Sequence, residues 1–241
     1  MALHIAQGLV TLIFIFPRLS PARRQRFIRS WDGKVLKIFA MRTQVDAPPG
    51  FDLARPQRLY IGNHISWIDV YALQSITGAR FVAKSELAAW PVLGTLIAKS
   101  GTIFIERAKR ADTRRIVKTV QQHLEDGEII AVFPEGSTTD GRDVNKFHGN
   151  LLQAAIDAGA QIVPFCLRYT DANRHFTTAP AYVGEMSLWE SLKLMLREKN
   201  LHCELTLFAP LEIAGRDRRQ LAHAAESLVR QRLQGHTRQD R

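Results

Sequence analysis

The segment Tyr60-Ile-Gly-Asn-His-Ile-Ser-Trp-Ile-Asp-Val70 joins a short apolar run, typical of a buried strand, to residues after Ser66 that favour a helix. It predicts a strand–turn–helix unit with His64 in the turn and Asp69 at the start of the helix. A neutral imidazole takes up a proton near pH 7, and a neighbouring carboxylate can hold the ring and stabilise its charged form. His64 and Asp69 are therefore the first candidates for a catalytic site.

The same residues also fit a plain capped helix. Ser66 as N-cap, with Asp69 in the position of the usual Glu, is the pattern of a capping box, and one carboxylate is not expected to serve both roles fully. A His and an Asp at this spacing also occur together often by chance. Residues five apart on an ideal helix point in different directions, so His64 must lie before the helix to reach Asp69. The local residues leave both interpretations open.

Strand-like and helix-like segments alternate outward from this unit. We expect strands at 58–61, 80–83, 102–105, 129–133, 161–168 and 203–208, and helices at about 66–76, 90–99, 112–126, 149–158 and 217–234. Such alternation predicts an α/β fold, with a mixed, mostly parallel sheet covered by helices. Residues 44–57 are rich in turn formers and mark a boundary between an N-terminal helical segment, 1–43, and a main domain, 44–241.

The composition narrows the class of partner. The chain has 241 residues and a formal net charge of +10, which suits an anionic membrane, a phosphorylated ligand or nucleic acid. The first two are favoured, because no zinc-finger spacing, helix-turn-helix signature or basic–aromatic stripe is present. Cys166 and Cys203 both lie in apolar runs, which predicts buried free thiols and neither a disulfide nor a metal site.

The N-terminal residues favour contact with a membrane surface. The apolar run Ala2–Phe16 is shorter than the ~20 residues needed to cross a bilayer. The segment 20–39 repeats large apolar residues every four positions, with basic residues among them, as in a helix that lies on an anionic surface. The alternative is an ordinary helical hairpin packed on the core.

Several polar residues follow predicted strands. Glu135, Gly136 and Ser137 come after the strand 129–133, in a turn that could present N–H groups to an anion. Arg107 and Lys84 each end a strand, and Arg binds phosphate in a two-pronged manner. The alternatives are a turn without a ligand and a solvated charged face.

Four blocks, taken in order, resemble the glycerolipid acyltransferases, most closely the bacterial 1-acyl-sn-glycerol-3-phosphate acyltransferases. They are Asn63–Asp69, which is similar to that family's His-x4-Asp block, Gly101–Arg107, Phe133–Ser137 and Ile162–Phe165. The resemblance covers roughly residues 58–170. One departure follows the third block, where His148 stands in a Phe147-His-Gly-Asn150 context that often carries a lysine in the family. The loop 137–141 also resembles a branch that acts on other lysolipids.

The resemblance implies transfer of a fatty acyl group from acyl-CoA or acyl carrier protein to the sn-2 hydroxyl of 1-acyl-glycerol-3-phosphate, without a further cofactor, a metal or an acyl-enzyme. It further implies that His64 acts as general base and that Asp69 orients it. The implied substrate-binding residues are Lys84, Arg107, Glu135, Gly136 and Ser137, with Asn63, Ser66 and His148 as additional candidates. The implied location is the cytoplasmic face of a bacterial inner membrane. Alternatives are another lysolipid such as lyso-ornithine lipid, glycerol-3-phosphate, water as acceptor in a hydrolase, and a basic membrane-binding module without activity.

Overall fold

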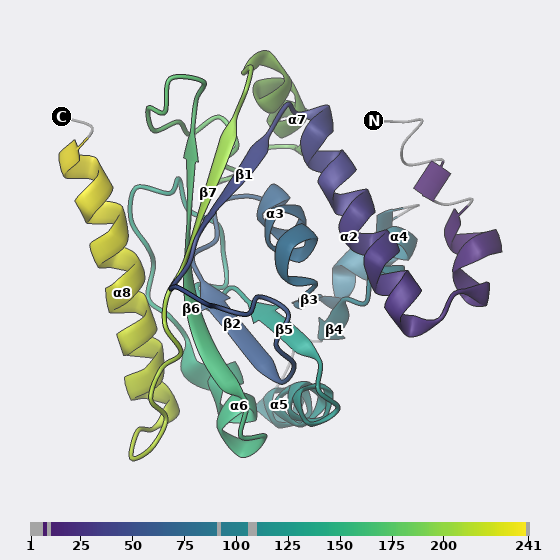
Figure 1. Cartoon of the computed structure of the whole chain (residues 1–241), viewed down its shortest axis with the longest axis vertical. Helices are drawn as coiled ribbons and strands as arrows, with labels where there is room; N and C mark the ends of the chain where they lie inside the picture. Colours follow the sequence, from purple (N-terminus) through teal and green to yellow (C-terminus); the bar gives the residue numbers. More distant parts are fainter. Residues whose placement is uncertain (1–6, 9–10, 91–92, 106–109, 240–241) are drawn as a thin grey trace.

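A computed structural model describes residues 7–8, 11–90, 93–105 and 110–239. Its centre is a seven-stranded sheet in the order β1-β7-β6-β2-β5-β3-β4 (Figure 1). The strands are β1 (Arg42–Asp46), β2 (Arg58–Gly62), β3 (Arg80–Lys84), β4 (Ile103–Ile105), β5 (Ile129–Val132), β6 (Gln161–Thr170) and β7 (His202–Leu207). Only the β6–β7 pair is antiparallel among them, which confirms the predicted mixed, mostly parallel sheet.

Helices cover both faces of this sheet. They are α2 (Pro21–Ile38), α3 (Ile68–Thr77), α4 (Leu93–Lys99), α5 (Arg110–Glu125), α6 (Leu152–Asp157), α7 (Leu188–Arg197) and α8 (Arg218–Gln239), with short helical turns at Thr11–Ile15, Phe16–Arg18, Ser85–Ala89 and Gly149–Leu151. In Figure 1, α8 lies on one side of the sheet, and α2 and α3 lie on the other. The result is a three-layer α/β/α arrangement.

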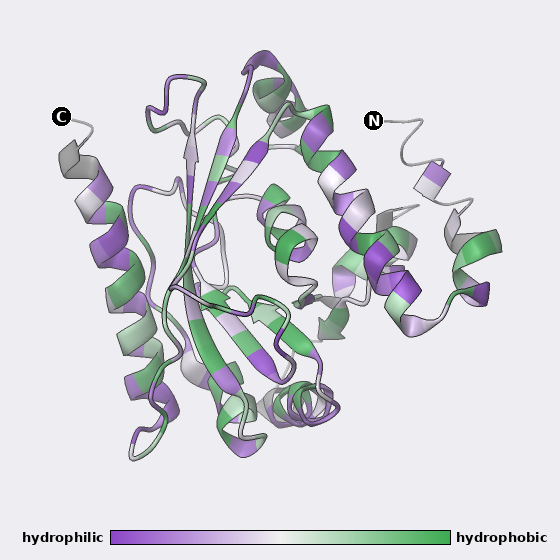
Figure 2. Cartoon of the chain, viewed as in Figure 1, coloured by the Kyte–Doolittle hydropathy of each residue, from purple (hydrophilic) through white to green (hydrophobic). Residues whose placement is uncertain are grey.

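Alternate residues of each central strand supply the two cores. Tyr60 of β2 faces the core formed with α2, α3 and α7, whereas Leu59 and Ile61 face the core formed with α5, α6 and α8. Strands buried on both faces are rich in apolar residues throughout, and Figure 2 shows β2, β5 and β6 as largely hydrophobic. The strand-end residues thereby come together along the carboxyl edge of the parallel strands.

Two elements were not expected from the sequence. Residues 44–46, assigned to a turn-rich boundary, instead continue strand β1, which pairs in parallel with β7 and spans the boundary drawn at residues 43 and 44. This strand lies at the sheet edge and is mostly exposed, so it lacks the apolar pattern that marks a strand. Helix α7 was also missed, although Ser187 and Glu190 form a complete capping box at its start.

Helix α2 packs on the core, as the hairpin alternative proposed. The stripe assigned to a membrane surface is largely turned inward, with Val35 and Phe39 buried and Trp31 partly buried against the same core. Arg29 donates to two backbone carbonyls at the end of α3, at 3.1 Å and 2.6 Å, and Gln25 donates to Gly78 O. The last carbonyls of a helix have no partner within that helix, so these side chains of α2 supply the hydrogen bonds that α3 cannot make itself.

The exposed apolar residues of the N-terminal part lie before α2. Phe14 is 62% exposed and Ile15 is 50% exposed. None of the helices in the described ranges has both the length and the apolar character needed to span a membrane.

Candidate active site

His64 lies in the turn between β2 and α3, and its ring reaches back to the helix. The His64 Nδ1 and Asp69 Oδ2 atoms are 2.8 Å apart. A carboxylate only accepts hydrogen bonds, so Nδ1 carries the shared proton and Nε2 presents a lone pair. The Asp69 side chain is 0% exposed and that of His64 is 21% exposed, so the imidazole reaches solvent while its partner does not.

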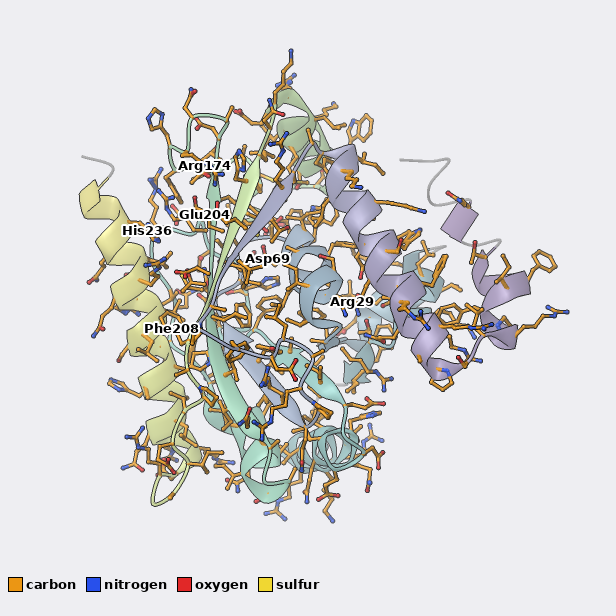
Figure 3. All side chains as sticks on the ribbon, viewed as in Figure 1. Arg29, Asp69, Arg174, Glu204, Phe208 and His236 are labelled. Atoms are coloured by element: carbon orange, nitrogen blue, oxygen red, sulfur yellow. The ribbon has the colours of Figure 1, made fainter. Side chains whose placement is uncertain are left out.

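Among the described residues, four donors hold the Asp69 carboxylate. Oδ2 also accepts from the Ile65 and Ser66 backbone N–H groups, at 2.7 Å and 2.8 Å, and Oδ1 accepts from the Tyr169 hydroxyl at 2.6 Å. Charge-assisted bonds of this kind are short and strong, and together they fix the carboxylate before any substrate arrives. Asp69 belongs to the first turn of α3, and its label in Figure 3 lies next to the sheet.

The two interpretations of this turn are therefore compatible. Asp69 Oδ2 accepts from Ser66 N, as a capping box requires, and from the His64 ring at the same time. A single oxygen, Oδ2, faces all three donors, so this half of a capping box forms together with the contact to His64. The other half of the box is absent here, since Ser66 Oγ accepts from Ile68 N at 3.4 Å and α3 begins at Ile68 rather than Ser66.

An aromatic stack supports the imidazole. The His64 ring lies parallel to the Phe133 ring, with centroids 3.9 Å apart and an interplanar angle of 7°. Phe133 in turn stacks on Phe81 at 5.4 Å and meets Phe165 edge-on at 6.0 Å. The rings come from three different strands or strand ends, so the sheet itself sets the plane of the base.

Glu135 clamps the backbone beside the base. Its Oε1 accepts from His64 N and its Oε2 from Asn145 N, each at 2.7 Å, and the side chain is buried. Burial raises the pKa of Glu135 to about 7, although both N–H groups pull the pKa down. Its described contacts position the turn, and its expected contact with substrate stays a prediction.

The start of the turn is fixed by Asn63 and Gly62. Asn63 exchanges two hydrogen bonds with the backbone of Leu167 on β6, at 2.9 Å and 2.7 Å. A Cβ on Gly62 would lie 2.3 Å from Phe165 O, so only glycine allows this approach. Asn63 and Ser66 are both fully buried, and their described contacts are structural.

The structure describes the remaining predicted site residues to different extents. Arg107 lies outside the described residues. The register of β3 with β4 puts Lys84 at the carboxyl end of its strand, but its side chain is not described. Gly136 and Ser137 occupy an exposed turn after Glu135, with Gly136 at a φ of 79°. His148 is exposed beyond the loop, where its N–H bonds to Pro134 O at 3.0 Å.

Two residues of the site, Tyr169 and Phe133, were not predicted from the sequence. Tyr169 lies in an apolar strand. A buried tyrosine needs a hydrogen-bond partner for its hydroxyl, and this requirement could have indicated a polar group nearby. Burial and the adjacent Asp69 raise the pKa of Tyr169 above its usual value, so it remains a hydroxyl donor. The stacking of Phe133 on His64 had no sequence signal. Among the described residues, no group of three or more His, Cys, Asp and Glu side chains could hold a metal ion.

The fold and the site define an α/β protein with an oriented, partly exposed histidine at the carboxyl ends of the parallel strands. A model of the family described as Acyltransferase matches residues 49–168. The chain is 33% identical to the lyso-ornithine lipid O-acyltransferase of Pseudomonas aeruginosa, over 88% of this chain and 80% of that protein. The chain belongs to this acyltransferase family, and the expected enzyme class is confirmed.

Two further comparisons bear on the fold and on the relatives. The chain is 37% identical to the 1-acyl-sn-glycerol-3-phosphate acyltransferase of Neisseria gonorrhoeae, over 55% of this chain and 54% of that protein. The crystal structure of the LPA acyltransferase PlsC from Thermotoga maritima matches with a TM-score of 0.67 and 18% identity, over 98% of this chain and 94% of that one. That structure supports the α/β fold.

Proposed function

We propose that this acyltransferase moves a fatty acyl group from a thioester to a free hydroxyl of a lysolipid, with His64 as general base. The observation that carries the proposal is the 2.8 Å contact between His64 Nδ1 and Asp69, which leaves Nε2 as the available lone pair. Nε2 takes the hydroxyl proton while the acceptor oxygen bonds to the thioester carbonyl carbon. The tetrahedral intermediate then collapses, the C–S bond breaks, and the departing thiolate receives the proton from the imidazolium.

Direct attack is favoured over an acyl-enzyme. Cys166 and Cys203 are both buried, and burial raises the pKa of Cys166 to about 12, so little thiolate forms near pH 7. Ser66 is fully buried and its hydroxyl faces Ile68 N. The sequence also lacks the Gly-x-Ser-x-Gly turn that exposes a nucleophilic serine.

The first test replaces the base. With His64→Ala we expect kcat to fall by about 10²–10⁴-fold, the usual contribution of a positioned general base. Release of free thiol from acyl-CoA in the presence of a lysolipid measures the rate. A variant that keeps most of the rate would rule out His64 as the base.

Two acceptors follow from the comparisons. Relatives named lyso-ornithine lipid O-acyltransferase align over more of the chain, 88% and 95% for two of them, which favours lyso-ornithine lipid. The 1-acyl-glycerol-3-phosphate alternative rests on the shorter match and on the strand-end residues Lys84 and Arg107 as phosphate contacts. A panel of these two lysolipids and glycerol-3-phosphate with one acyl donor separates them, and the acceptor with the highest kcat/KM is the substrate. Fatty acid release without any acceptor would indicate a hydrolase instead.

A membrane surface is the proposed working location, as expected for an enzyme whose substrate is a lipid. Exposed Phe14 and Ile15, followed by the exposed basic residues Arg18, Arg23 and Arg26, supply the apolar and cationic groups that such contact needs. Because α2 is part of the core, point variants test this better than truncation. We expect Phe14→Asp/Ile15→Asp to weaken flotation with anionic vesicles, whereas Val45→Asp on the edge strand should not. Equal flotation of all three proteins would refute this location for the contact.

A further inference from the structure

A hollow of about 790 Å³ lies where the segment 146–150 meets the N-terminal turns of α8. Ligand sites commonly have volumes of ~300–1,000 Å³. Its lining is basic, and we name it the basic hollow after the six residues that give it this character. They are Lys146, His148, Arg216, Arg218, Arg219 and His223.

Among the described residues, the lysine and arginines of the basic hollow form no ion pair with an acid. In the part of the chain that the structure describes, no hydrogen bond or ion pair joins the side chains of Lys146, Arg216, Arg218 or Arg219 to a carboxylate. The acidic lining residue, Glu226, already accepts from Phe147 N at 3.0 Å and from Arg230 at 3.1 Å. The hollow therefore presents unpaired positive charge to whatever enters it.

Asp217 lies beside the hollow and offsets part of its positive charge, because its carboxylate interacts electrostatically with Arg219 and Arg218. Its Oδ1 caps α8 by accepting from the N–H groups of Arg219 and Gln220, at 2.7 Å and 2.8 Å. By contrast, Arg168 pairs with Glu204 at 3.0 Å and Arg232 pairs with Asp46 at 2.9 Å.

The basic hollow is linked to the catalytic turn through one loop. His148, on its rim, donates its N–H to Pro134 O at 3.0 Å. The next residue, Glu135, accepts from His64 N at 2.7 Å. A ligand held in the hollow therefore lies against the far end of the loop that clamps the base.

We propose that the basic hollow binds the phosphate groups of coenzyme A, the donor's carrier, and this rests on the proposed function. The 3′-phosphate and the diphosphate of coenzyme A are clustered anions, which match a cluster of arginines that bind phosphate through paired N–H groups. The long pantetheine arm lets these phosphates bind at a distance from the thioester. The hollow thereby separates donor anchoring from the chemistry at His64.

The test measures coenzyme A binding by calorimetry, without turnover. We expect Arg216→Ala/Arg219→Ala to raise the Kd for coenzyme A about tenfold or more, because each lost charge-assisted contact weakens binding severalfold. Both side chains are exposed, so the fold should survive, and circular dichroism checks this. The matched control is Lys34→Ala/Lys37→Ala, which removes two exposed cations of α2 and should leave the Kd unchanged. Dephospho-coenzyme A, which lacks the 3′-phosphate, should bind the native protein more weakly than coenzyme A does. Its Kd should also rise less than that of coenzyme A in Arg216→Ala/Arg219→Ala.

Each other outcome overturns the proposal. A Kd unchanged within about twofold, or an equal loss in the control, would mean that the hollow does not hold the donor. Loss of flotation with anionic vesicles, with coenzyme A binding intact, would assign the hollow to lipid headgroups. A raised KM for acyl carrier protein alone would assign it to that protein. His64→Ala should keep coenzyme A binding while losing turnover, so failure of the general-base mechanism and failure of this site give different results.

Discussion

Replacing Asp69 by Asn separates the charge of this side chain from its hydrogen bonds. The amide oxygen must face Ile65 N and Ser66 N, because an amide NH2 there would oppose two donors. The NH2 group then faces the Tyr169 hydroxyl, which can turn to accept. His64 Nδ1 still donates to an oxygen, so Asp69→Asn keeps the ring and its tautomer in place and removes only the negative charge.

The size of the effect follows from the distance. Opposite charges ~4 Å apart interact by about 4 kcal/mol at an effective dielectric constant of 20, and this bonded pair is at least that close. The interaction develops when the imidazolium forms, so it stabilises the transition state more than the ground state. Since ~1.4 kcal/mol is tenfold in rate, we expect Asp69→Asn to lower kcat by about 10²–10³-fold with little change in KM.

The assay is thiol release at saturating donor and acceptor, beside a thermal melt by circular dichroism. Asp157→Asn serves as control, because Asp157 is an exposed residue at the end of α6 and its Oδ1 accepts from the Gln153 side chain. The melting temperature of Asp69→Asn should stay within a few degrees of the native value, as the bonds are retained. A kcat within about fivefold of native, with an intact fold, would show that the charge of Asp69 does not assist the reaction.

Three further predictions concern the buried polar groups. Tyr169→Phe removes the donor to Asp69 Oδ1, so urea unfolding should show a loss of about 1.5–3 kcal/mol and kcat should fall at constant KM. Glu135→Gln leaves one oxygen for two N–H donors and should cost about 1–3 kcal/mol. Burial raises the Glu135 pKa from 4.5 to about 7, so native stability should fall as pH rises across that range, and a stability–pH titration should lack this step in the variant. Burial also raises the pKa of Asp32, whose Oδ2 has no hydrogen-bond partner among the described residues. Asp32→Asn should therefore melt above the native protein at pH 8, with the gap closing toward pH 4; a constant gap would contradict this.

The central strands could be predicted because they are buried on both faces. The sheet position of β2 and β5 requires apolar residues on each side, and this leaves a clear signal in the sequence. The edge strand β1 has no such requirement, since its backbone bonds to β7 supply its stability while its side chains face solvent. Its residues Arg42–Asp46 therefore carry no pattern from which a strand could be recognised.

Amphipathicity in α2 predicted a helix correctly but did not identify what the apolar face contacts. An apolar stripe is the same whether it meets a lipid surface or α3, and only the three-dimensional packing decides between them. Arg29 illustrates the point: as a sequence feature it adds positive charge, but in the fold it donates to the carbonyls of Ser75 and Ile76. Basic residues in an amphipathic helix are therefore weak evidence for a membrane until their partners are known.

The turn between β2 and α3 explains how His64 and Asp69, five residues apart, form a rigid pair. His64 and Asp69 are too far apart on a helix to meet, so the pair requires that the chain turn before α3 and that this turn be fixed. The donors that fix it, Ile65 N and Ser66 N, converge on the same Oδ2 that holds the imidazole. Starting the helix and orienting the base are thus one set of bonds. A substitution that loosens the helix start should therefore lower kcat even where it touches neither ring nor substrate.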